Sequence, residues 1–150
     1  MQSLDDLVTL KGRVTLHLLR EDGSEYHDEI DNLVVTAGKG VIADRMKGTP
    51  SLAAMSHAAV GTGATAPAAG DTTLQTEVGG SRTALTSTNV AGAVITYAAS
   101  LGPGVGTGAL TEAGLFNASS AGNMLARTTF SVINKAAGDT LSITWNVTVG

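Results

Sequence analysis

The C-terminal end of the chain alternates strictly between apolar and polar residues, a pattern that few folds can accommodate. The apolar positions are Leu141, Ile143, Trp145, Val147 and Val149, and the polar positions between them are Ser142, Thr144, Asn146 and Thr148. Successive side chains of a β-strand point to opposite faces of its sheet, so this segment predicts an antiparallel strand with one buried and one solvent-facing side. Trp145, the only tryptophan, is expected in the core.

Other segments show strand-like patterns, separated by turns that contain glycine. The further expected strands are Leu7–Arg20, Glu25–Asp31, His57–Val60, Ser81–Val90, Ala93–Ser100, Ala109–Asn117 and Asn123–Ser131. Several short strands at intervals of roughly 10 residues are typical of β-sandwiches. We therefore predict a mostly β protein, an antiparallel β-sandwich resembling a jelly roll, built as a single domain over residues 1–150 with one short helix.

The first 31 residues differ from the rest in charge and are expected to form a hairpin. Val14, Leu16 and Leu18 share one face of the first strand, Gly23 lies in the turn, and the returning strand over residues 25–31 is polar and expected to be exposed. Residues 1–31 could also serve as an N-terminal arm that reaches a neighbouring molecule.

Helical signals are sparse. The segment Thr36–Gly48 predicts one short helix, with Thr36 as its N-cap and Gly48 at its end, although two glycines near its start weaken the pattern. Asp71 is a candidate cap for a short helical turn over residues 72–78.

The chain carries few charges beyond Gly48. Charged residues make up 15% of the sequence, against about 25% in an average globular chain. The chain has nine basic and 13 acidic residues, and of these charged residues only seven in all lie beyond Gly48. A free monomer usually keeps about a quarter to a third of its surface charged. We therefore expect the protein to be a homo-oligomer, a dimer or trimer, whose subunits cover much of this surface. A neutral surface rich in Thr, Ser and Asn is the alternative.

Composition also argues against several classes of protein. The net charge is −4 and no run of Lys or Arg occurs, so nucleic-acid binding has no electrostatic support. The absence of cysteine excludes disulfides and thiolate metal sites. No apolar stretch approaches about 18 residues and residues 1–10 lack a basic leader pattern, so we expect no membrane span and synthesis in a cytoplasm.

No pattern for catalysis or cofactor binding stands out. The loop Gly61–Ala66 (GTGATA) lacks the third glycine and the parallel strands of a dinucleotide site, and is interpreted as an inter-strand loop. His17, His27 and His57 form no metal-ligand spacing. His27 lies beside Asp28 and Glu29, but adjacent strand residues point to opposite faces, which favours a solvated strand over a metal site. A metal shared between subunits remains an open alternative.

Glu112 lies in an otherwise apolar strand. A buried carboxylate normally needs a partner, and Arg82 and Arg127 are the candidates. We interpret Glu112 as part of a structural salt bridge, and the sequence predicts no catalytic, cofactor-binding or metal-ligating residue and no enzyme activity.

Three segments resemble virion structural proteins of tailed bacteriophages. They are Asn32–Met46 (NLVVTAGKGVIADRM), Val60–Val78 (VGTGATAPAAGDTTLQTEV) and Leu110–Val149, which contains the stretch GDTLSITW at residues 138–145. The resemblance spans most of residues 32–149 and rests on the order of these segments rather than on a diagnostic motif. It implies a capsid decoration (cement) protein that binds the major capsid protein and stabilises the shell of the virion, after synthesis in the bacterial host cytoplasm.

Two alternatives stay open beside capsid decoration. The same resemblance fits a tail-tip, baseplate or tail-fibre subunit that contacts tail proteins, although the absence of a repeat favours a compact subunit over a whole fibre. A carbohydrate-binding module would need aromatic platforms, for which Tyr26 and Tyr97 are the candidates.

Overall fold

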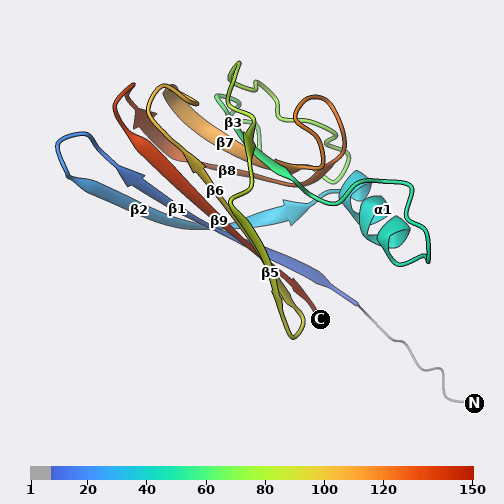
Figure 1. Cartoon of the computed structure of the whole chain (residues 1–150). Helices are drawn as coiled ribbons and strands as arrows, with labels where there is room; N and C mark the ends of the chain where they lie inside the picture. The colour runs from blue at the N-terminus through green and yellow to red at the C-terminus, as the bar shows by residue number, and fades with distance from the viewer. Residues whose placement is uncertain (1–7) are drawn as a thin grey trace, which may run out of the picture.

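The computed structural model describes residues 8–150 as nine strands and one helix (Figure 1). The elements are β1 (Leu10–Leu19), β2 (Glu25–Val34), α1 (Thr36–Arg45), β3 (His57–Gly61), β4 (Thr83–Ala84), β5 (Ser87–Ala91), β6 (Val94–Leu101), β7 (Gly108–Phe116), β8 (Met124–Lys135) and β9 (Thr140–Val149). The protein is therefore mostly β with one short helix, as predicted. Within residues 8–150 no helix has the length and apolar character needed to cross a bilayer.

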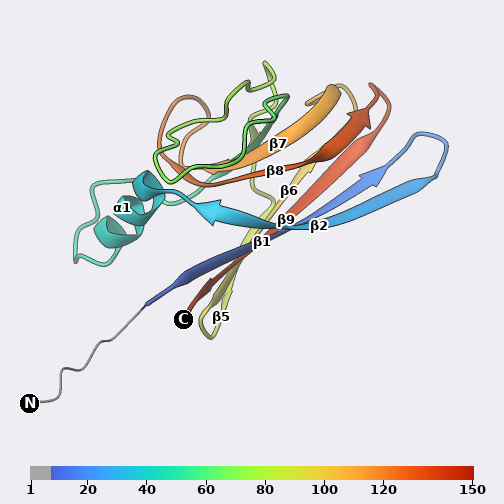
Figure 2. The ribbon, with the colours of Figure 1, turned by 180° about the vertical axis from the view of Figure 1, so that it is seen from behind.

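All nine strands join one antiparallel sheet that curls into a half-barrel. The strand order is β4-β3-β7-β8-β2-β1-β9-β6-β5. β2 and β8 pair only at Leu33–Arg127 and Val34–Ala126, and the two parts of the sheet diverge from this short joint (Figures 1 and 2). The jelly-roll arrangement of two separate sheets is not confirmed.

The core fills the concave side of the curled sheet. Trp145 is 1% exposed, and its strand neighbours Ile143 and Val147 are also buried, which confirms the prediction from the C-terminal alternation. β1 and β6 flank β9, so that Val14 and Tyr97 both stand opposite Trp145.

The N-terminal hairpin forms as predicted, with Gly23 at a positive φ of 88° in its turn. From Leu10 onward, however, it is an integral part of the sheet and not a separate arm. β1 pairs with β9 along its whole length, from Leu10–Val149 to Leu19–Thr140. The outer residues of the proposed arm, 1–7, lie outside the described residues. β2 is polar and largely exposed, as expected.

The helix α1 is shorter than predicted and begins differently. Val35 is its N-cap and forms no side-chain cap hydrogen bond, while Thr36 is already helical, so the prediction of Thr36 as the cap was wrong. The glycine at position 38, inside this helix, has a packing role. A side chain there would collide with the backbone of Leu125 in β8, so the helix packs closely on the sheet only because position 38 has none.

The region after β3 also differs from the prediction. Residues 72–78 form no helical turn. Asp71 does not cap a helix, because its carboxylate accepts hydrogen bonds from the Ala68 N–H (2.9 Å) and from Arg127 (3.1 Å). The expected strand over residues 81–90 is divided into β4 and β5.

Candidate functional site

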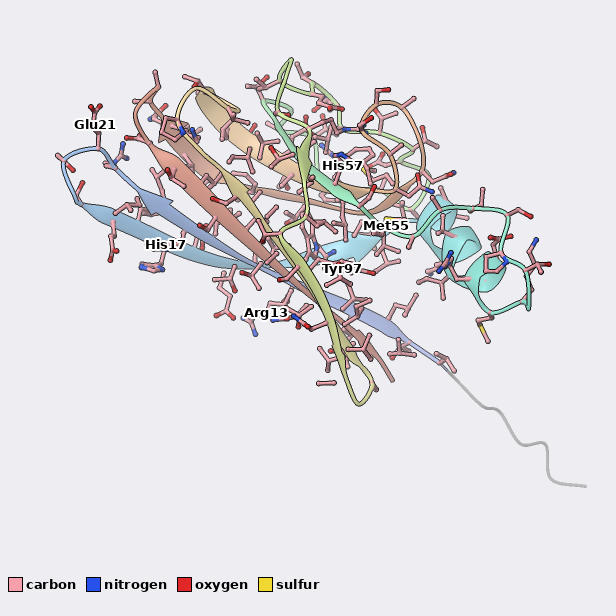
Figure 3. All side chains as sticks on the ribbon, viewed as in Figure 1. Arg13, His17, Glu21, Met55, His57 and Tyr97 are labelled. Atoms are coloured by element: carbon pink, nitrogen blue, oxygen red, sulfur yellow. The ribbon has the colours of Figure 1, made fainter. Side chains whose placement is uncertain are left out.

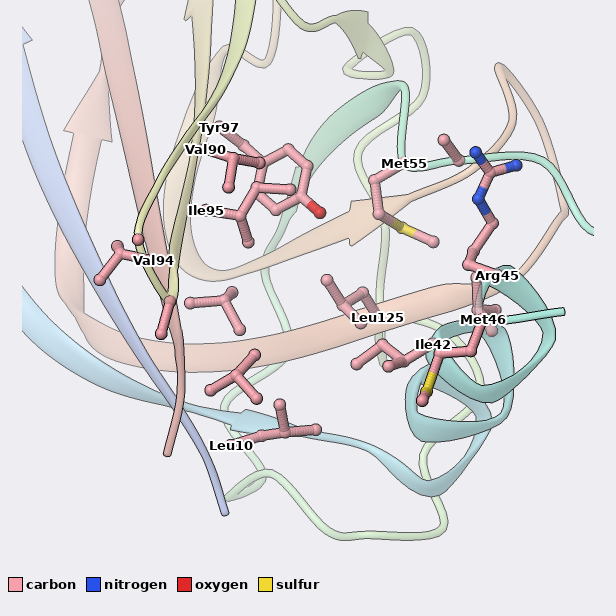
Figure 4. Close-up of a pocket in the computed structure, with 16 residues that line it drawn as sticks. Leu10, Ile42, Arg45, Met46, Met55, Val90, Val94, Ile95, Tyr97 and Leu125 are labelled. Carbon is pink, nitrogen blue, oxygen red and sulfur yellow. The ribbon is translucent and has the colours of Figure 1, made fainter. Parts of the chain in front are cut away.

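An apolar groove of about 590 Å³ opens where α1, the β5–β6 hairpin and the outer ends of β1 and β9 meet (Figure 4). The β5–β6 hairpin contributes Val90, Val94 and Ile95, α1 contributes Ile42, and Met46 follows as the C-cap of this helix. Further lining residues from other strands are Leu10, Leu125, Val147 and Val149. The groove thus gathers apolar side chains from both ends and the middle of the chain.

Two polar side chains, Tyr97 and Arg45, are the ionisable groups among the residues lining this groove within residues 8–150. Tyr97 is 8% exposed, and burial raises the pKa of its phenol, so the hydroxyl stays neutral at physiological pH. Arg45 lies at the mouth and donates a hydrogen bond to the Leu52 carbonyl at 3.4 Å. The groove therefore offers apolar surface rather than acid–base or nucleophilic chemistry.

Apolar side chains that are unusually exposed surround the groove. Met46 is 83%, Val90 70% and Val149 43% exposed. All residues of β5 are exposed, and among the described residues no strand pairs with its outer edge. Exposed apolar patches and open strand edges are features by which proteins associate. We define the assembly face as the groove together with the open edge of β5.

A second, interior cluster contains the carboxylate singled out in the sequence. Glu112 lies in β7, and its Oε2 is 2.8 Å from Nη2 and 2.9 Å from Nε of Arg127 in β8. The predicted salt bridge is therefore confirmed, with Arg127 as the partner. Arg82 instead pairs with Glu77 at 2.8 Å and lies over the Phe116 ring, 3.5 Å from its centroid.

Glu112 also holds the loops that follow β3. Its carboxylate accepts hydrogen bonds from the backbone N–H groups of Gly63 (3.1 Å), Gln75 (3.0 Å) and Thr76 (2.7 Å). Burial alone would raise the pKa of this carboxyl, but the three N–H donors and Arg127 outweigh burial and lower the pKa below its ordinary value. The ionised Glu112 carboxylate thus has a structural role, because its hydrogen bonds hold the loops that follow β3.

The loop at Gly61–Ala66 follows β3 in a sheet whose described pairings are all antiparallel. The Gly63 N–H, which a phosphate would need, is bonded to Glu112. The interpretation of this loop as an inter-strand connection fits the geometry, and no parallel βαβ unit surrounds it in residues 8–150.

Two of the three histidines come together. His17 in β1 stands directly opposite His27 in β2. Their rings stack with centroids 4.1 Å apart and planes inclined by 7°. Glu25 lies beside both rings, on the same face of β2 as His27. His57 is elsewhere (Figure 3) and shares a 2.8 Å hydrogen bond with Ser56.

The pair is not apparent when His27 is compared only with its neighbours along the chain. Asp28 does point to the opposite face, as expected, but the partner comes from the other strand of the hairpin. A three-residue loop, Glu21–Gly23, is closed by the Arg20 N–H donating to the Ser24 carbonyl, and this loop length sets the pairing of residue 17 with residue 27. The hairpin register is therefore the signal that could have found the pair.

No protein-family model, curated protein or solved structure matches the chain. The aromatic candidates for a sugar platform are not brought together. Tyr97 lies in the groove, whose other lining is aliphatic apart from Arg45 and two methionines, whereas Tyr26 lies on the hairpin strand β2.

Proposed function

We propose that this protein is a structural subunit of a bacteriophage virion, and that it works by assembly rather than by catalysis. The observation that carries the proposal is the assembly face, where Met46, Val90 and Val149 expose apolar surface beside an open strand edge. A protein that acts alone in water gains nothing from such a face. A subunit that packs against neighbours buries it, which stabilises the assembly by about 25 cal/mol for each Å² of apolar surface.

We infer that a second copy of the same chain binds to this face. β5 is short and antiparallel to β6, and its outer edge is open to pairing with β5 of another copy. Pairing of two β5 strands would place Val90 of each copy at the contact. The two parts of the curled sheet share one buried core, which gives such a subunit a rigid body.

Within the virion we propose the capsid shell as the site of action, where the protein would act as a decoration protein on the major capsid protein. The sequence resemblance to virion proteins and the low charge beyond Gly48 support this location. A location at the tail tip, baseplate or fibre is the second candidate, because the resemblance supports it too and the assembly face would serve there equally well.

Copy number in purified particles separates the two locations. We expect hundreds of copies for each particle and capsids that rupture more readily on heating when the protein is missing. A few copies confined to the tail fraction would move the protein to the tail, and capsids equally robust without it would contradict a cement function.

A carbohydrate-binding function has weaker support. Sugar sites are built on aromatic platforms with polar neighbours, whereas Tyr97 is buried among aliphatic groove residues. Binding of a host polysaccharide that is lost in Tyr26→Ala or Tyr97→Ala would favour this function over the structural one.

A further inference from the structure

The outer face of the β1–β2 hairpin carries a cluster of two imidazoles and one carboxylate, formed by His17, His27 and Glu25. One ligand atom from each residue lies within 4.8 Å of the others. The hairpin register produces this convergence, because His17 and His27 are direct cross-strand partners and Glu25 is two residues from His27 on the same face.

Both imidazoles direct Nε2 toward the same carboxylate. The distance from His17 Nε2 to Glu25 Oε1 is 3.4 Å, and the distance from His27 Nε2 to Glu25 Oε2 is 3.8 Å. These separations exceed the usual 2.7–3.2 Å of an N–H···O hydrogen bond. Within residues 8–150, Nε2 of His17 is buried and has no hydrogen-bond partner. The two imidazoles and the carboxylate therefore lie close together, but the distances between them are too long for good hydrogen bonds.

From this geometry we propose that His17, Glu25 and His27 bind one divalent transition-metal ion, of which Zn²⁺ is the representative. Zinc takes imidazole nitrogen at about 2.0–2.1 Å and carboxylate oxygen at about 2.0–2.2 Å, so ligand atoms on one ion lie no more than about 4.2 Å apart. The cluster reaches this spacing when the two imidazole rings, which now stack at an angle of 7°, turn so that their Nε2 atoms converge on one ion. The side chains are 34%, 53% and 62% exposed for His17, Glu25 and His27, so they have room to move.

The donor set selects the class of ion. Two neutral imidazoles and a carboxylate suit zinc, copper or nickel, whereas calcium and magnesium prefer ligand sets made of oxygen. Three protein ligands leave a fourth tetrahedral position, which water fills.

The surrounding charges favour a cation at this place. Glu29 and Asp31 lie on the same face of β2, and the nearby base is Arg13, which is 3.2 Å from Glu29 and 3.9 Å from Asp31. With Glu25, three carboxylates lie along this face together with two bases, Arg13 and, farther along β1, Lys11. In β9, Ser142 stands opposite His17 and adds no charge.

Zinc titration of the full chain, without a polyhistidine tag, tests the proposal by isothermal calorimetry. We expect one zinc ion for each chain. His17→Ala and His27→Ala should each weaken the affinity by at least about tenfold, and Glu25→Gln should weaken it as well. His57→Ala is the matched control, because this histidine lies outside the cluster, and it should bind zinc like the unmodified protein.

Cobalt(II) gives a second readout that reports geometry directly. The unmodified protein should develop the visible absorption of tetrahedral Co²⁺, and zinc should displace it. Far-UV circular dichroism verifies that each variant is folded, and Glu25→Gln provides a test if either histidine variant is not. Absence of saturable binding, or binding that the His17, His27 and Glu25 substitutions leave unchanged, would overturn the proposal.

Discussion

Oε2 of Glu112 lies 2.8 Å from Nη2 of Arg127 in the interior of the protein, where the two side chains are 0% and 2% exposed. Arg127 also reaches Asp71 at 3.1 Å. Because Glu112 accepts hydrogen bonds from Gly63, Gln75 and Thr76 as well, the pair connects β7 and β8 to the loops that follow β3. This cluster holds the least regular part of the fold on the sheet.

Replacing Glu112 should destabilise the protein strongly. Glu112→Gln removes the charge that compensates Arg127 and leaves a buried guanidinium with only Asp71 as a partner, so we expect a loss of about 3–5 kcal/mol in the free energy of unfolding. Urea denaturation measures it. Glu29→Gln is the control, because Glu29 pairs with Arg13 on the exposed hairpin and should cost less than about 1 kcal/mol. Equal small losses in both variants would contradict the structural role of Glu112.

The same carboxylate should make stability fall in acid. Its pKa in the folded protein lies below the ordinary value of 4.5, so folding favours the ionised form. The contribution of Glu112 to the free energy of unfolding is fully present above the ordinary pKa and is lost as the pH falls through the lower pKa of the folded protein. Asp139 behaves alike, because the Ala136 N–H and other donors lower its pKa. Urea midpoints between pH 7 and pH 3 should therefore decline less steeply for Glu112→Gln than for the unmodified protein, and parallel curves would contradict this assignment.

The two central glycines of α1 should respond in opposite directions to alanine. Gly38→Ala places a methyl group against the Leu125 backbone, so the helix must move away from β8 and stability should fall. Gly40 has open space around the corresponding position, and Gly40→Ala should stabilise the protein by up to about 1 kcal/mol through better helix propensity. Thermal denaturation of the two variants compares them directly, and a Gly38→Ala variant at least as stable as the unmodified protein would contradict the close packing at Gly38.

Trp145→Ala should cost about 3–5 kcal/mol, because the side chain is fully packed between β1 and β6. Val149→Ala, at the exposed end of the same strand, should cost less than about 1 kcal/mol. Chemical denaturation followed by circular dichroism suits both variants, since it does not depend on tryptophan fluorescence. A near-neutral effect of Trp145→Ala would place this residue outside the core.

The parts of the fold that were predictable are those with a local signal. The alternation around Trp145 and the apolar positions of β1 specify strands with one buried face, and the Asp22–Gly23 turn specifies the hairpin. Local signals failed where a distant contact decides the structure. Asp71 resembles a helix cap in sequence, but its carboxylate is engaged by Arg127, which is 56 residues away.

In the candidate sites, too, the features with a local signal were predictable and those that depend on distant contacts were not. The pairing of Glu112 with an arginine was predictable because a carboxylate in an apolar strand needs a partner, whereas the choice of Arg127 over Arg82 depends on the β7–β8 register. The apolar groove was not predictable, because α1, the β5–β6 hairpin and the ends of β1 and β9 meet only when the sheet has curled.

The molecular mass of the purified protein in solution tests the assembly face most directly. Light scattering after size-exclusion chromatography should give twice the 15.0 kDa of one chain, because pairing of one β5 edge with another joins two copies. Val90→Asp, on the exposed β5, should shift the protein to a folded monomer, while Val132→Asp, an exposed position in β8 that does not line the groove, should not. A monomer at all concentrations, or an oligomer that Val90→Asp leaves intact, would contradict the proposal that this face joins copies of the chain.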